Sequence, residues 1–192
     1  LTIDEIEDIV RRFGVCAAAV KKAGFTGVQV HAAHGYLLSQ FLSPRSNQRT
    51  DSYGGSLENR ARALLDCVAA VRKAVGTGFP VAVKLNSADF QKGGFAFSES
   101  LQVAEWLQAA GVDLIEISGG TYEQPKLLGI AGIEDEEPQA VAQSTQLREA
   151  YFVDFALAMQ AKVTIPLMVT GGFRQRAAME QALASGSADL IG

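Results

Sequence analysis

Val81-Ala82-Val83-Lys84-Leu85-Asn86 is a short run of mainly apolar and β-branched residues that ends on a polar side chain. A run of this kind is typical of a strand in a parallel sheet that helices cover. Four other segments have a similar character, and they span residues 27–31, 113–118, 166–170 and 188–191. The sequence therefore predicts five short parallel strands.

Stretches with apolar residues at helical spacing separate these strands. The first spans residues 3–22, and Thr2 and Glu5 stand where a capping box would begin it. Ser56 is the expected N-cap of a helix over 56–75, and Ser98 that of a helix running to residue 110. Two more helices are expected over 148–160 and 177–184. Strict alternation of strands and helices predicts an α/β fold.

Two α/β architectures share this alternation: an open doubly wound sheet and a closed (β/α)8 TIM barrel. No G-x-G-x-x-G motif of the dinucleotide-binding type follows a first strand. Polar residues instead end the strands, where a barrel keeps its active site: His31, Asn86, Ser118 and Thr170. A complete barrel takes ~250 residues. We therefore expect residues 1–192 to be a single, partial TIM-barrel domain with about strands 4 to 8, from a longer protein.

The charge, the apolar runs and the cysteines of the chain indicate which kinds of partner it can have. A net charge of −4 and the lack of a Lys/Arg stripe argue against nucleic acid. No apolar run approaches the ~20 residues that span a bilayer, and no signal peptide opens the chain. Cys16 and Cys67 do not form a disulfide scaffold, which favours a cytoplasmic protein. We expect a small-molecule substrate rather than nucleic acid or a membrane.

His31 and His34 are the only histidines, and they flank the end of the first strand just before Tyr36. They could donate hydrogen bonds to one carbonyl or anionic oxygen. They could instead be metal ligands with Asp51 or Asp89 as a third, or one could lie in the core and the other on the surface. Tyr36 carries a phenol that can give a proton at pH 7, or it could be purely structural.

Lys84 is a cation in an otherwise apolar strand, which is costly unless it is paired. Alternation places it on one face with Ala82 and Asn86, where it could meet an anionic cofactor or reach solvent. Gly171-Gly172 follows the fourth strand and could form either an anion cradle or a plain turn. The long loop over 41–55 is typical of a functional segment. Four polar residues could fix its shape: Asn47, Arg49, Asp51 and Arg60.

Two segments together resemble one known family. They read His31-Ala-Ala-His-Gly-Tyr-Leu-Leu-Ser-Gln-Phe-Leu-Ser-Pro and Asn47-Gln-Arg-Thr-Asp-Ser-Tyr-Gly-Gly-Ser-Leu-Glu-Asn-Arg. Both resemble the old yellow enzyme family of FMN-dependent NAD(P)H reductases, and the resemblance covers the whole chain. The family has a (β/α)8 barrel, so the resemblance implies that the chain runs from the third helix to the eighth strand.

The resemblance also implies roles for particular residues. His31 and His34 would bind the carbonyl or nitro oxygen of an electron-poor alkene such as an enone, and Tyr36 would protonate the alkene carbon. Reduced FMN, recharged by NAD(P)H, would give the hydride, as in ene-reductases. Lys84 would lie near the flavin where many members carry Arg, and Gln29 stands where many carry Glu. The other cofactor-binding residues would be Gly171 and Gly172 near the FMN phosphate, together with Phe173.

The sequence is also compatible with other functions. The chain could be a catalytically incomplete barrel piece that associates with itself or a partner to cover its sheet edges. It could be part of a metal-dependent hydrolase built on the two histidines, although we expect no metal site. A homo-oligomer is possible, and an iron–sulfur cluster could lie in a C-terminal extension, as in some family members. We expect the isolated 192-residue chain to bind FMN weakly or not at all, because some family contacts lie outside it.

Overall fold

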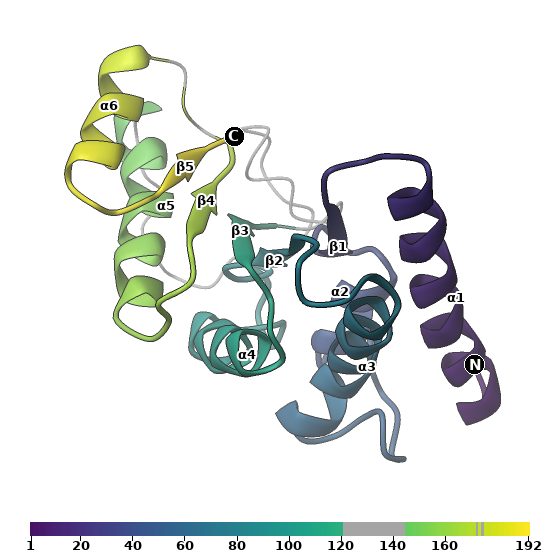
Figure 1. Ribbon diagram of the computed structural model, residues 1–192. Helices are drawn as coiled ribbons and strands as arrows, with labels where there is room; N and C mark the ends of the chain where they lie inside the picture. The colour runs from purple at the N-terminus through teal and green to yellow at the C-terminus, as the bar shows by residue number, and fades with distance from the viewer. Residues whose placement is uncertain (121–144, 172, 174) are drawn as a thin grey trace.

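A computed structural model describes residues 1–120, 145–171, 173 and 175–192. Its strands form one parallel sheet in the order of the sequence (Figure 1). They are β1 (Val28–Ala32), β2 (Val81–Asn86), β3 (Leu114–Ser118), β4 (Leu167–Val169) and β5 (Leu190–Ile191). A doubly wound sheet reverses its strand order at a switch point. The sequential order is instead that of a barrel wall, and the predicted α/β fold is confirmed.

The described helices are α1 (Ile3–Lys22), α2 (Leu37–Leu42), α3 (Leu57–Val75), α4 (Phe97–Ala109), α5 (Thr145–Gln160) and α6 (Arg176–Ala184). In Figure 1, α1 and α6 lie at opposite ends of the sheet. The predicted capping box of α1 is confirmed, because Thr2 and Glu5 each accept the other's backbone N–H. Ser56 caps α3 as expected. None of the helices described is long and apolar enough to cross a membrane.

Some local details of the helices differ from the predictions. Ser98 is not the N-cap of α4, which begins at Phe97 after Ala96. The Glu99 carboxylate accepts the Ala96 N–H at 3.1 Å, so a side chain from inside the helix satisfies that terminus. The short helix α2 was not expected either, and six residues are too few to show a helical period. Helix α5 begins at Thr145, three residues before the predicted start.

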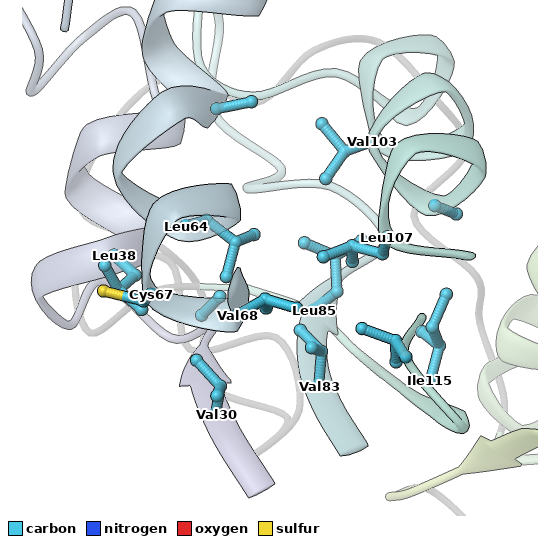
Figure 2. Packing of buried hydrophobic residues seen from close by; sticks show 14 of the residues in the cluster. Val30, Leu38, Leu64, Cys67, Val68, Val83, Leu85, Val103, Leu107 and Ile115 are labelled. Carbon is cyan, nitrogen blue, oxygen red and sulfur yellow. The ribbon is translucent and has the colours of Figure 1, made fainter. Parts of the chain in front are cut away.

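The hydrophobic core lies between the helices and one face of the sheet (Figure 2). Leu64 and Val68 of α3 are fully buried, and in Figure 2 they lie over Val83 and Leu85 of β2. Burial also raises the pKa of the Cys67 thiol to about 12. Because successive side chains of a strand alternate between its faces, the residues between these core positions point away from the helices. This second face carries Lys84 and Asn86.

The predicted polar network does fix the loop between α2 and α3. Asn47 donates both amide hydrogens, to the Phe41 and Tyr53 carbonyls, at 2.7 Å each. Arg49 pairs with Asp51 within the same loop. Arg60 works separately from these, and it joins three segments. It donates to the carbonyls of Leu42 and Gly55 and pairs with Glu99 of α4.

Candidate active site

The structure brings His31, His34 and Tyr36 together at the carboxyl end of β1. The ring centroids of His31 and His34 are 5.3 Å apart, and those of His31 and Tyr36 are 5.0 Å apart, both edge to face. His34 adopts a left-handed conformation with φ 62°, which turns the chain sharply after the strand. Helix α2 follows at once, and Ser39 in its first turn accepts the Gly35 N–H at 3.2 Å. The unexpected helix therefore holds this turn in place.

The hydrogen bonds of the two imidazoles distinguish them. His31 Nδ1 accepts the Ala33 N–H at 3.2 Å. A neutral imidazole has one acceptor and one donor nitrogen, so His31 carries its proton on Nε2 and can donate there. His34 Nε2 lies 2.6 Å from the Ser118 hydroxyl of β3. The His34 backbone N–H donates to Asn86 Oδ1 of β2 at 3.2 Å. Two neighbouring strands thus fix His34.

The environment of both histidines favours the neutral imidazole. Burial lowers the pKa of each imidazole below the ordinary value of 6.5, and the positive charge of Lys84 lowers it further. The carboxylate of Glu116 opposes this shift without cancelling it. Neutral imidazoles can donate to an oxygen on which charge develops without bringing a full charge of their own into the site.

Lys84 is paired across the sheet rather than reaching solvent. Its Nζ lies 2.8 Å from Glu116 Oε1 of β3, and the side chains are 18% and 5% exposed. The other carboxylate oxygen accepts the Gln29 amide of β1 at 2.6 Å. Burial opposes ionisation of Glu116, but the hydrogen bonds from Lys84 and Gln29 help to bring its pKa below the ordinary range. We call Gln29, Lys84 and Glu116 the interior triad.

Sequence reasoning missed Glu116, although a signal was present. Glu116 interrupts an apolar strand in the same way as Lys84. A buried charge is costly unless it is paired, so two buried charges of opposite sign are expected to form an ion pair. The triad also accounts for Gln29. An amide can donate to Glu116, whereas a carboxylate in its place would set two negative charges side by side.

Asn86 continues the polar face into a buried network. Its Nδ2 donates to Asp89 Oδ1 at 3.0 Å, and Asp89 Oδ2 accepts the Phe95 N–H at 3.0 Å. Burial raises the pKa of the Asp89 carboxyl in spite of these bonds. Asp89 and Asp51 are thus engaged with protein donors. Within the described ranges, no three His, Cys, Asp or Glu residues gather as metal ligands would.

The end of β4 supplies the remaining predicted cofactor residues. Gly171 has φ 97°, a conformation that favours glycine, and Phe173 packs partly buried against the core. Gly172 lies outside the described residues. The Thr170 hydroxyl just before them is buried and makes no hydrogen bond within the described structure. The Ser87 hydroxyl, which follows β2, is also buried and makes no hydrogen bond within the described structure.

Sequential parallel strands that carry imidazoles, a phenol and a lysine toward their carboxyl ends are typical of the active-site face of a (β/α)8 barrel. More narrowly, the chain belongs to the NADH:flavin oxidoreductase / NADH oxidase family, whose sequence model matches residues 1–192.

Relatives and solved structures agree with this assignment. The NADH-dependent flavin oxidoreductase iliE of Neonectria sp. (strain DH2) is 42% identical over 193 residues, which are 100% of this chain and 25% of that protein. A 2-naphthoyl-CoA reductase in complex with 2-naphthoyl-CoA superimposes with a TM-score of 0.86 at 33% identity, over 100% of this chain and 27% of that one. The old yellow enzyme homologue from Zymomonas mobilis gives 0.76 at 25% identity, over 100% and 48%.

These comparisons confirm the predicted old yellow enzyme family and the partial barrel, and the family itself is one of oxidoreductases that use flavin and NADH. The chain spans between 25% and 48% of the proteins just named. The predicted roles of individual residues stay predictions.

Proposed function

We propose that the protein containing this chain is an NAD(P)H-dependent FMN oxidoreductase of the ene-reductase type. Its substrates would be electron-poor alkenes such as enones and nitro compounds. The observation that carries the proposal is the cluster of His31, His34 and Tyr36, whose rings meet edge to face one strand away from Lys84. Two neutral nitrogen donors beside a phenol match a reaction that polarises an oxygen and protonates a carbon.

The residues present fit FMN. Lys84 supplies a cation for the electron-rich edge of a flavin ring, and the positive φ of Gly171 suits a backbone turn against a phosphate. The buried hydroxyls of Ser87 and Thr170 have hydrogen-bonding capacity that no described residue uses. We place Gly172 and Phe173 in the same cofactor-binding set. When bound, FMN would supply the hydride chemistry that protein side chains cannot.

The chain's own residues would orient and protonate the substrate. His31 would donate from Nε2 to the substrate oxygen, because its Nδ1 already accepts the Ala33 N–H. His34 would help to hold that oxygen from its fixed place between β2 and β3. Tyr36, which is 46% exposed, is accessible to an incoming molecule and would give its proton to the α-carbon. Pulling charge onto the oxygen makes the β-carbon a better hydride acceptor.

The test uses the full-length protein loaded with FMN and Tyr36→Phe. With NADPH or NADH and 2-cyclohexen-1-one, the wild-type protein is expected to form cyclohexanone while oxidising the nicotinamide. Tyr36→Phe removes the proton donor, so we expect enone turnover to fall by a factor of about 10² or more. Anaerobic bleaching of the flavin by NAD(P)H should keep its rate, because that step takes no proton from Tyr36.

Tyr53→Phe is the matched control. The Tyr53 hydroxyl donates to Asp66 at 3.1 Å, and the Tyr53 side chain packs in the core. The rates of enone turnover and of flavin bleaching should therefore stay near those of the wild type. Equal enone turnover in Tyr36→Phe and the wild type would refute the assignment of the proton donor. A full-length protein without a flavin spectrum would refute the proposed function. A cytoplasmic location, a homo-oligomer and the alternative of a self-associating piece stay predictions.

A further inference from the structure

In the interior triad, the positive charge of Lys84 is offset by the negative charge of Glu116. Lys84 and Glu116 are held at 2.8 Å, and both are largely buried. Inside a protein such charges are weakly screened, so their sum decides the field that a neighbouring group feels. A lysine alone would add one positive charge to this face of the sheet. Lysine and glutamate together add close to none.

The pairing also fixes where the ammonium lies. Lysine is a flexible point charge with several rotatable bonds, and it adopts one position only when a partner holds it. Register places Lys84 directly beside Glu116 on the neighbouring strand, and Gln29 holds the second carboxylate oxygen from β1. Three strands thus set the position of one Nζ atom.

We propose that Glu116 is a positioning residue that holds Lys84 against the cofactor site and, by offsetting its charge, lowers the reduction potential of the bound flavin. The inference rests on the proposed function, because it needs FMN beside Lys84. Accepting a hydride adds two electrons and one proton, so it adds one negative charge to the flavin. A nearby unmatched cation favours that change, and an anion beside the cation diminishes the preference.

The test is the two-electron potential of FMN in the full-length protein, measured against a reference dye during slow anaerobic reduction. Glu116→Gln keeps the shape of the side chain and removes its charge. We expect the equilibrium constant for reduction to rise about tenfold, which is a shift of about +30 mV for a two-electron couple. The exchange Gln29→Glu with Glu116→Gln returns one carboxylate to the triad, and its potential should move back toward that of the wild type.

Glu99→Gln is the matched control, because Glu99 also pairs with a cation, Arg60, but lies on α4. Its flavin potential should equal that of the wild type. If Glu116→Gln does not fold, Glu116→Ala takes its place, because it also removes the carboxylate and leaves the Lys84 ammonium room for water. The potential should again be higher without that charge.

The outcomes separate the two proposals. Flavin bound with an unchanged potential in Glu116→Gln, or in Glu116→Ala where that variant replaces it, would overturn the role of Glu116 and leave the proposed function standing. A wild-type protein that binds no FMN would overturn the proposed function itself. Because a purely structural role would lower stability without moving the potential, the measurement distinguishes structure from charge.

Discussion

Replacing Arg60 with methionine removes the side chain that joins α2, the loop after it, α3 and α4. The arginine is 5% exposed and donates to the Leu42 and Gly55 carbonyls and to the Glu99 carboxylate. Methionine fills a similar volume but donates nothing. The variant therefore isolates the hydrogen bonds of Arg60 from its packing.

The expected loss follows from what each partner keeps. A buried acceptor left without its donor costs about 1–3 kcal/mol. Breaking a fully buried ion pair costs about 3–5 kcal/mol. The Glu99 side chain is 24% exposed and keeps the Ala96 N–H, so water and that donor compensate much of its loss. We expect the free energy of unfolding to fall by about 3 kcal/mol in total.

Urea denaturation of the full-length protein, followed by circular dichroism, measures this loss as a lower midpoint. Arg60→Lys keeps the charge with a single donor group, so its midpoint should lie between those of Arg60→Met and the wild type. Arg11→Met is the control, because Arg11 pairs with Asp8 on the surface with its side chain 65% exposed, and we expect no measurable change. Equal midpoints for Arg60→Met and Arg11→Met would refute the reasoning.

Two further predictions concern the site and the core. In NMR titrations of the full-length protein, His31 and His34 should titrate below pH 6.5, and Lys84→Met should raise both midpoints, although burial keeps them below 6.5. As the pH falls through 6.5, the unfolded chain binds these protons before the folded chain does. The two histidines should therefore lower the free energy of unfolding as the pH falls below 6.5. Midpoints at or above 6.5 would contradict their burial. Leu64→Ala should cost about 3 kcal/mol in a urea titration, since Leu64 is 0% exposed in the core. Leu183→Ala, at a position 44% exposed, should cost far less, and equal losses would contradict the placement of Leu64.

The sequence predicts the regular elements well where a local signal exists. The strand at Val81–Asn86 and the helix at Ile3–Lys22 have the predicted bounds, because a β-branched run and a capping box are local features. Helix α4 shows the limit of such signals. Ser98 is a good N-cap by residue type, but a carboxylate that also pairs with Arg60 sets the helix start two residues earlier.

In the candidate site, too, the residues that are close in sequence could be predicted and the distant contacts could not. His31, His34 and Tyr36 are close in sequence, so a turn brings them together and sequence reasoning finds them. Glu116 is 87 residues from its partner Gln29, and their contact depends on strand order and register. An isolated sequence fixes neither quantity. It can show that Lys84 needs an anion, but only the sheet shows which one lies beside it.

The two histidines, which the sequence presents as a pair of equal donors, have different capacities in the fold. His31 commits Nδ1 to its own turn and keeps the Nε2 proton for a ligand. His34 commits Nε2 to Ser118, and a hydroxyl can act there as donor or acceptor. If Ser118 donates, the His34 proton lies on Nδ1; if Ser118 accepts, it lies on Nε2. The tautomer of His34, and hence its share in holding a substrate oxygen, is therefore set from β3, the strand that also carries Glu116.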